Sequence, residues 1–219
     1  MERVIEPELM DSPEQAQAYA RANFQSANDL FVDTFDQRFG HPGHGALVVD
    51  MGCGPADIPI RFLRNYSGSF IHAVDGSKAM LEHARRSVEE AGLDHAIRIY
   101  CKELPRDDLP AGGYDVLLSN SLLHHLHDPG ALWFMIQSYG RKGAPVCVMD
   151  LFRPENEDDA RGLVDRYAAE EPEVLRTDFY NSLLAAFRPE EVQGQLDQAG
   201  LKLDVEPVSD RHMVISGTL

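Results

Sequence analysis

The sequence predicts an α/β fold in which a mostly parallel sheet lies between helices on both faces. Short apolar runs rich in β-branched residues, such as 47–49, alternate with longer segments whose apolar residues recur at helical spacing. This alternation is typical of parallel strands joined by crossover helices. The chain has 219 residues, 43% of them hydrophobic and 26% charged, which is the size and composition of one globular domain with one large core.

The charge balance limits the classes of partner. Acidic residues outnumber basic residues by 36 to 20, and the resulting net charge of −16 repels nucleic-acid phosphates and anionic membranes. No apolar run approaches the ~20 residues that span a bilayer, and residues 1–10 lack the basic start and apolar centre of a signal peptide. We therefore expect a cytoplasmic monomer or homodimer that acts on a small molecule, with no nucleic-acid or membrane partner.

The cysteines carry no metal or redox signature. Cys53, Cys101 and Cys147 show no C-x-x-C spacing, and each lies in or beside a predicted strand. We expect three buried free thiols.

Residues 1–43 are expected to form a helical cover ahead of the main domain, 44–219. Residues 1–10 read as a flexible lead-in, and Ser12-Pro13 then predicts the start of a helix over 13–24. Apolar residues at helical spacing predict a second helix over 26–39. These helices either pack against the sheet or cover a ligand, with Tyr19 or Phe24 facing it.

The segment 47–58, LVVDMGCGPADI, predicts a buried strand that runs into a glycine turn and a helix. Asp50 ends the strand, and the glycines at 52 and 54 allow a sharp bend close to a ligand, at the N-terminus of the following helix. Asp57 stands where the dinucleotide fingerprint G-x-G-x-x-G has its third glycine. A carboxylate there disfavours a pyrophosphate and favours a ligand with a cationic, amino-acid-like group, such as S-adenosylmethionine.

A second acid follows at the position expected for ribose binding. The strand predicted at 70–74 ends in Asp75, 25 positions beyond Asp50, where a Rossmann-like unit places the acid that accepts the ribose hydroxyls. Together, VVDMGCGPADI and AVDGSKAML resemble motif I and the second-strand motif of class I S-adenosylmethionine-dependent methyltransferases. The resemblance covers roughly 45–217. It implies a Rossmann-like, seven-stranded, mostly parallel sheet with a C-terminal antiparallel hairpin, and S-adenosyl-L-methionine as the cofactor.

The resemblance also assigns roles to residues at the carboxyl ends of the strands. It implies that Asp50 and the glycine turn hold the methionine end, that Asp75 holds the ribose and that Met80 covers the adenine. Glu103 and the backbone at Leu104 are expected at the adenine amino group. The expected cofactor-binding residues are Asp50, Gly52, Cys53, Gly54, Asp75, Gly76, Ser77, Met80, Glu103, Leu104, Ser119 and Asn120.

The segment SNSLLHHLHDP follows the strand predicted at 114–118 and resembles the methyl-transfer segment of small-molecule methyltransferases. It offers four potential metal ligands within five positions, but adjacent side chains on a short helix diverge, so we expect no metal. A histidine here can instead take a proton from the acceptor, or it can simply shape the pocket. The candidate catalytic residues are His125, which is preferred, His124 and Asn120.

The acceptor side is expected from the fifth strand, 144–149, and from an acidic helical insert at about 153–187. Such an insert lies over the carboxyl ends of the strands, although a strand-end cap and a solvated helical pair are equally simple interpretations. A helix at 189–200 and a hairpin of 201–206 with 212–217 complete the chain. The candidate acceptor-binding residues are Tyr19, Asp150, Arg153, Tyr180 and Asn181.

The expected reaction is direct, in-line methyl transfer to a small molecule, for which a dedicated base is optional. One alternative is a protein that binds S-adenosylmethionine without catalysis or for another reaction. The other is a nicotinamide-dependent oxidoreductase, which shares the strand order but requires the third glycine.

Overall fold

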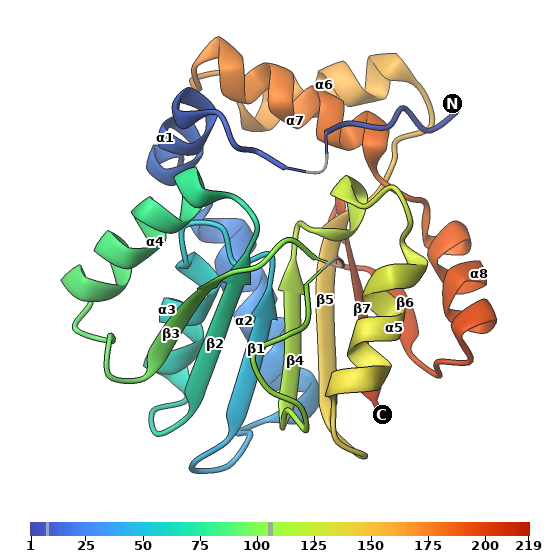
Figure 1. The fold of residues 1–219 in the computed structure, drawn as a ribbon. Helices are drawn as coiled ribbons and strands as arrows, with labels where there is room; N and C mark the ends of the chain where they lie inside the picture. Colours follow the sequence, from blue (N-terminus) through green and yellow to red (C-terminus); the bar gives the residue numbers. More distant parts are fainter. Residues whose placement is uncertain (8, 105–106) are drawn as a thin grey trace.

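The computed structural model, which describes residues 1–7, 9–104 and 107–219, is built on a seven-stranded sheet (Figure 1). The strand order is β3-β2-β1-β4-β5-β7-β6; the first five are parallel, and β7 runs antiparallel to β5 and β6. The predicted Rossmann-like sheet with a C-terminal antiparallel pair is therefore confirmed. The strands are β1 Leu47–Met51, β2 Phe70–Asp75, β3 Ile97–Cys101, β4 Val116–Asn120, β5 Pro145–Leu151, β6 Asp204–Pro207 and β7 His212–Thr218.

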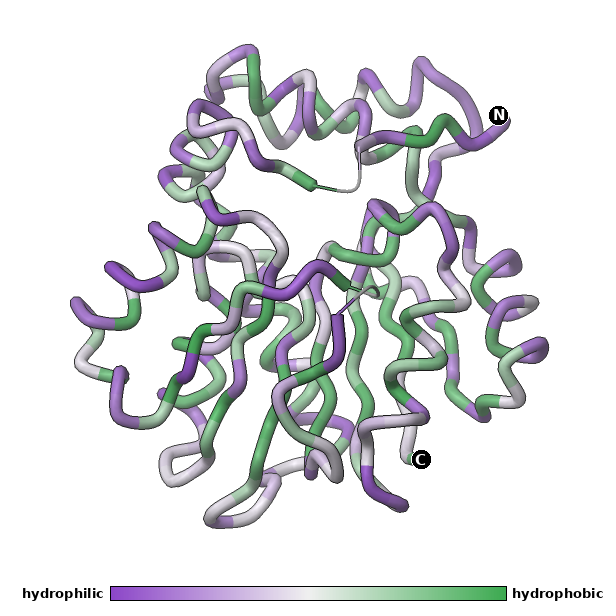
Figure 2. The backbone as a smooth tube through the Cα atoms, in the orientation of Figure 1, coloured by the Kyte–Doolittle hydropathy of each residue, from purple (hydrophilic) through white to green (hydrophobic). Residues whose placement is uncertain are grey.

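Helices cover both faces of the sheet because successive residues of each strand point to opposite sides. On one face, Phe35 of α2 packs edge-on against Phe62 of α3, with ring centroids 4.9 Å apart. On the other face, Trp133 of α5 is fully buried and donates its indole N–H to Gln195 of α8 at 3.0 Å. Figure 2 shows the strands as hydrophobic and the outer helices as mixed. The covering helices are α2 Gln25–Phe39, α3 Asp57–Asn65 and α4 Lys78–Glu90, and α5 Gly130–Tyr139 and α8 Pro189–Ala199.

A helical layer lies over the carboxyl ends of the parallel strands (Figure 1). Helix α1 contacts α4 and α7, and α7 contacts the short 3₁₀ turn η1. A small apolar cluster that includes Ala160 and Leu183 joins α6 and α7 to Leu151 of β5. Among the described residues, no helix has the length and apolarity that crossing a membrane requires. The elements of this layer are α1 Pro13–Arg21, η1 Leu123–His125, α6 Glu157–Tyr167 and α7 Glu173–Ala185.

The first residues of the chain are anchored beneath this layer, so the expected flexible lead-in is wrong. The Arg3 guanidinium donates to the carbonyls of His124 (2.8 Å) and Leu126 (3.1 Å) and lies over the Phe187 ring. Further along, the Met10 carbonyl accepts from the Ser77 hydroxyl at 2.8 Å. The Arg3 guanidinium also donates to the Ala185 carbonyl, so it satisfies carbonyls that the ends of α7 and η1 leave free.

Two local expectations also need correction. Strand β4 spans Val116–Asn120, two residues later than the expected 114–118, and Asp115 just before it accepts from the Leu47 amide (2.7 Å). Ser119 and Asn120 consequently lie within the strand. Cys101, at the end of the edge strand β3, is exposed, whereas Cys53 and Cys147 are buried as expected.

Candidate functional site

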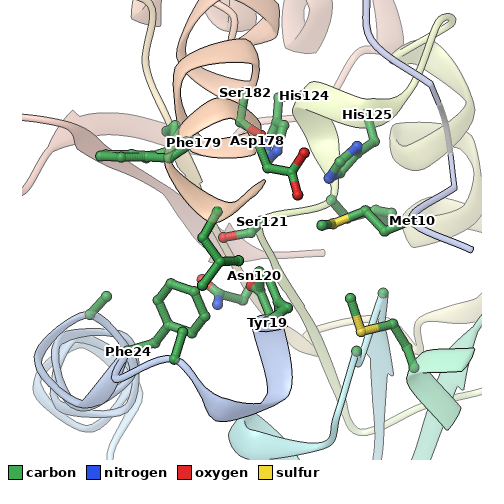
Figure 3. A pocket seen from close by; sticks show the side chains of 18 of the residues that line it. Met10, Tyr19, Phe24, Asn120, Ser121, His124, His125, Asp178, Phe179 and Ser182 are labelled. Atoms are coloured by element: carbon green, nitrogen blue, oxygen red, sulfur yellow. The ribbon is translucent and has the colours of Figure 1, made fainter. Parts of the chain in front are cut away.

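A cavity of about 270 Å³ lies between the carboxyl ends of the strands and the helical layer. One end is formed by the glycine turn after β1 and by Asp75 of β2. The other end is formed by α7, whose Asp178 and Ser182 face His124, His125 and Ser121 across the space (Figure 3). The cavity is continuous, which places two chemically different ends in one enclosure.

The glycine turn adopts backbone conformations that residues other than glycine rarely adopt. Gly52 and Gly54 have φ of 78° and 50°, in the left-handed region that favours glycine. A Cβ on Gly54 would project into open space, whereas one on Gly52 would meet the Leu122 Cβ at 2.9 Å. Ala56 (φ 71°) and Ser121 (φ 56°) adopt the same region without being glycine. Such strain is common at functional sites, and both residues flank the cavity or its turn.

Asp75 is positioned by the backbone around it. Its carboxylate accepts from the Gly54 amide (2.9 Å) and from the Ser77 amide (2.8 Å). Burial raises the pKa of Asp75, and these hydrogen bonds partly oppose the rise. Ser77 caps α4, accepting from the Met80 amide at 3.1 Å. Each Asp75 oxygen keeps a free lone pair, so it can also accept from a ligand hydroxyl.

Asp50 differs, because neither of its carboxylate oxygens has a hydrogen-bond partner among the described residues. It is 1% exposed and lines a small side cavity of about 30 Å³ that shares Gly52, Gly54 and Asn120 with the main one. Burial, followed by repulsion from Asp75, raises the pKa of Asp50 to about 8. The side-chain amide oxygen of Asn120 likewise has no hydrogen-bond partner in the described part of the chain. Buried, unsatisfied acceptors of this kind fit a ligand that brings a cationic, hydrogen-bonding group, which S-adenosylmethionine has.

Most of the expected cofactor residues gather at this end, with two exceptions. Ser119 is fully buried and donates its hydroxyl to the Met51 carbonyl at 2.9 Å, so it lies outside both cavity walls. Glu103 also lies outside the walls, and its amide donates to Asp107 at 2.9 Å. Cys53 and Asp50 line the side cavity. The residues that line the main cavity are Gly52, Gly54, Asp75, Gly76, Ser77, Met80, Leu104 and Asn120.

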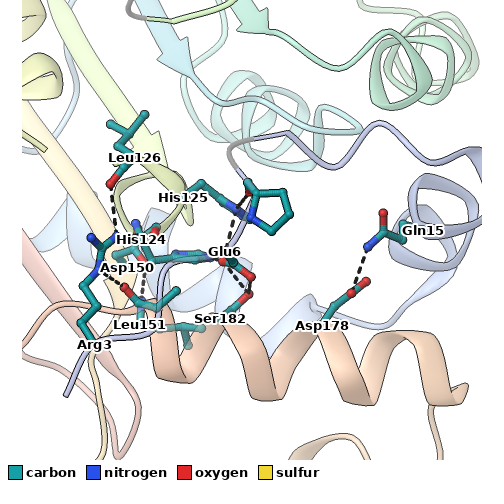
Figure 4. Close-up of polar contacts among 12 residues, drawn as sticks. Arg3, Glu6, Gln15, His124, His125, Leu126, Asp150, Leu151, Asp178 and Ser182 are labelled. Atoms are coloured by element: carbon teal, nitrogen blue, oxygen red, sulfur yellow. Dashed lines mark hydrogen bonds and ion pairs between the residues drawn. The ribbon is translucent and has the colours of Figure 1, made fainter. Parts of the chain in front are cut away.

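The two adjacent histidines of η1 converge with an acid from the start of the chain (Figure 4). His124 Nδ1 lies 2.5 Å from Asp150 Oδ1, and its Nε2 lies 3.5 Å from Glu6 Oε1. His125 Nδ1 lies 3.3 Å from the same Glu6 oxygen, and the two imidazole centroids are 4.2 Å apart. The expectation that these adjacent side chains diverge is therefore wrong for this pair.

The environments of these groups separate their pKa values. Burial alone lowers the pKa of His124, but Asp150 and Glu6 more than offset it and the net shift is upward. Burial and the neighbouring His124 lower the pKa of His125 to about 3. Burial raises the pKa of Glu6, against the attraction of His124. His125 is thus a neutral imidazole on the cavity wall, beside an imidazole held between two carboxyl groups.

Of the five candidate acceptor residues, Tyr19 alone lines the cavity. Asp150 is buried behind His124, and Arg153 is held by the Ala186 carbonyl (2.8 Å) and by Glu191. Tyr180 donates to Glu157 on the outer side, and Asn181 is exposed. These four lie outside the cavity wall.

The acceptor end of the cavity instead contains residues that sequence reasoning missed. On α7, Leu175, Asp178, Phe179 and Ser182 recur at the i, i+3, i+4 spacing of one helix face, which is a signal that the sequence did contain. Asp178 accepts from Gln15 at 3.0 Å through one oxygen, and its other oxygen is buried without a partner among the described residues. Other missed lining residues are Leu9, Met10, Asn28, Ser121, Leu122, Met149, Leu151, Tyr167, Arg211 and His212.

Comparisons with known proteins agree with this geometry. Residues 48–139 match the family model of a methyltransferase domain. A trans-aconitate 2-methyltransferase of Delftia acidovorans is 30% identical over 125 residues, which are 57% of this chain and 44% of that protein. A ubiquinone biosynthesis O-methyltransferase of Acinetobacter baylyi is 27% identical over 184 residues, 80% of this chain and 71% of that protein. The chain spans less than half the length of the trans-aconitate methyltransferases that it matches, at 44% and 43%.

Solved structures share the fold along nearly the whole chain. A SAM-dependent methyltransferase from Aquifex aeolicus superposes with a TM-score of 0.69 at 17% identity, covering 94% of this chain and 97% of that one. The plantazolicin methyltransferase BpumL in complex with SAH superposes with a TM-score of 0.72 at 14% identity, covering 95% of this chain and 91% of that one. Residues 48–139 therefore match a methyltransferase domain, and nearly the whole chain has the fold of S-adenosylmethionine-dependent methyltransferases.

Proposed function

We propose that this chain transfers the methyl group of S-adenosylmethionine to a small molecule bound beneath α7. The observation that carries the proposal is the single cavity that runs from the glycine turn and Asp75, past Asn120, to the inner face of α7. A cofactor at the first end would direct its reactive group toward the second. The enclosure by α1 and α7 favours a small acceptor.

The cofactor end has groups for each part of the molecule. Asp75 would accept from the ribose hydroxyls, Asp50 would meet the cationic methionine end, and Met80 and Leu104, which line the cavity, would flank the adenine. When bound, the sulfonium supplies a methyl group on a good leaving group. The chain aligns the two reactants and excludes water, which favours an in-line displacement in which positive charge disappears from the sulfur.

The acceptor end favours a neutral or cationic molecule with an apolar body. Phe24, Leu175 and Phe179 supply apolar wall, while the unpartnered Asp178 oxygen can accept from a hydroxyl or an amine. The Asp178 and Glu171 side chains oppose an anionic acceptor. Asn120 lies between the two ends, where it can orient the reacting group.

The histidines are the candidate groups for the acceptor proton. His125 lines the cavity as a neutral imidazole, so it is the better placed of the two. His124 is held between Asp150 and Glu6, so its role is to position the wall.

The test is release of S-adenosylhomocysteine with matched aromatic acceptors that differ only in carrying a hydroxyl, an amine or a carboxylate, with trans-aconitate included. We expect turnover with the hydroxyl or amine series and a loss of at least tenfold in kcat/KM in Asp178→Asn. Glu173→Gln, an exposed change on the same helix, serves as the matched control. Cofactor binding with no turnover on any acceptor would favour the non-catalytic alternative, and turnover confined to carboxylates would contradict the acceptor class.

A further inference from the structure

The cluster formed by Glu6, His124 and His125 has the composition of a metal site. Two imidazoles and one carboxylate are the ligand set that zinc takes in sites with an open coordination position. The three side chains come from two segments of the chain, residues 1–7 and η1, which meet beneath α7 (Figure 4). We propose that these residues bind a divalent transition ion of the zinc class, with its open position toward the acceptor end of the cavity.

The distances between the donor atoms fit such an ion. Glu6 Oε1 lies 3.5 Å from His124 Nε2 and 3.3 Å from His125 Nδ1, and the three ligand atoms all lie within 4.8 Å of one another. Donors about 2.0–2.1 Å from a tetrahedral zinc ion are about 3.3–3.4 Å apart. Two edges of the triangle already have that length. The third edge, between the two histidine nitrogens, is no longer than 4.8 Å.

The surrounding contacts orient His124 and Glu6 as outer groups do in metal sites, whereas His125 Nδ1 lies 3.3 Å from the Pro7 carbonyl, a contact that the ion would replace. Asp150 lies 2.5 Å from Nδ1 of His124, which leaves Nε2 free to face Glu6 and the proposed ion. Ser182 of α7 donates to the Glu6 carboxylate, with its hydroxyl 3.2 and 3.4 Å from the two oxygens. The Arg3 guanidinium, the nearest cation from the same segment, is directed to the carbonyls of His124 and Leu126.

An ion pair is the competing interpretation, and it requires fewer of these residues than a metal ion does. A protonated His124 between Asp150 and Glu6 needs no contribution from His125. A bound ion needs all three ligands, so His125 separates the two interpretations. His124 and His125 both line the main cavity, which leaves the fourth coordination position accessible to water or to an acceptor oxygen.

Ion binding would also change the role of the histidines in the proposed reaction. A coordinated His125 no longer takes a proton, and the ion instead lowers the pKa of an oxygen bound to it. This consequence depends on the proposed function, whereas binding of the ion does not. The test therefore measures binding directly.

The experiment uses the full, untagged chain after dialysis against a chelator. Calorimetry with Zn²⁺ should give one ion per chain, and Co²⁺ should give the visible absorption of a four- or five-coordinate site. Glu6→Gln and His125→Gln should each weaken binding at least tenfold and reduce the Co²⁺ bands. His95→Gln, which changes an exposed histidine before β3, should leave both signals unchanged.

Folding of each variant is checked by circular dichroism. Glu6→Gln preserves the shape of the side chain, so it decides the question if His125→Gln does not fold. Absence of stoichiometric Zn²⁺ binding to the wild-type chain would overturn the proposal. Binding that survives both substitutions in folded protein would overturn it equally, and the cluster would then be an ion pair.

Discussion

Asp50 and Asp75 occupy the ends of neighbouring strands, yet the hydrogen bonding of their carboxylates differs. Asp75 is held by two backbone amides, whereas Asp50 is buried without a partner among the described residues. The first arrangement fixes a carboxylate that can accept two further hydrogen bonds. The second leaves a carboxyl group whose ionisation at neutral pH is promoted by an arriving cation.

Replacing Asp75 should weaken cofactor binding. Asp75→Ala removes an acceptor for the ribose hydroxyls and releases the Gly54 amide, so we expect a loss of about 1–3 kcal/mol in the binding free energy. Calorimetric titration with S-adenosylhomocysteine measures it. Asp94→Ala, at an exposed position before β3, is the control, and an unchanged affinity in Asp75→Ala would remove this residue from the site.

Cofactor affinity should rise with pH because of Asp50. With a pKa of about 8, the free protein holds a proton on this carboxyl at pH 6 and 7. A cationic ligand favours the carboxylate, so binding releases that proton and the affinity rises by up to about tenfold per pH unit. The window from pH 6 to 7 is suitable because the α-amino group of the ligand, with an ordinary pKa near ~7.7–8.0, stays largely charged there.

Asp50→Asn provides the matched comparison, since it keeps the shape and removes the titration. Calorimetry in buffers of different ionisation enthalpy should detect proton release from the wild type and little from the variant. A wild-type affinity that is flat across this window would contradict the role given to Asp50.

At the scale of elements, the first residues of the chain connect helix α7 to η1 across the site. Arg3 joins the end of α7 to η1, and Glu6 reaches the two histidines. Arg3→Met keeps much of the apolar side chain but leaves three carbonyls without this donor. We expect a loss of about 1–3 kcal/mol in the free energy of unfolding, together with faster proteolysis near the N-terminus.

Urea denaturation and limited proteolysis measure these two effects. Arg64→Met, at an exposed position on α3, should change neither. Wild-type rates of cleavage in Arg3→Met would show that the Arg3 contacts do not hold residues 1–7 in place.

Helix α2 is fixed to α3 by aromatic packing. Phe35 is fully buried and contacts the rings of Phe39, Phe62 and Tyr66. Phe35→Ala leaves a cavity that its neighbours cannot fill, so the free energy of unfolding should fall by about 3–5 kcal/mol. Phe134→Ala, where the side chain is 66% exposed, should change it by less than about 0.5 kcal/mol. Equal effects in urea titrations would contradict the assigned packing.

At the scale of the whole molecule, local patterns predicted the sheet and the cofactor end. The β-branched runs and the glycine turn are short-range features, and the structure contains both of them. The role of residues 1–10 was not predictable in the same way. Glu6 meets His124 across 118 positions of sequence, and no periodicity in its own segment indicates that contact.

The residues at the acceptor end were difficult to predict for a related reason. Arg153 and Tyr180 are polar residues of the insert, but which side of a helix faces a cavity depends on tertiary packing. Asp178 and Ser182 face it because α7 lies against α1 and η1. The spacing of these residues along α7 shows that they share one face, and only the fold shows which way that face points.

The most direct test of the account is a crystal structure of the chain with S-adenosylhomocysteine. We predict a nucleoside in the cavity between β1 and β2, with its ribose hydroxyls within hydrogen-bond distance of Asp75 and its sulfur directed toward Asn120 and α7. An empty cavity at saturating ligand, or a nucleoside bound elsewhere on the chain, would contradict the account.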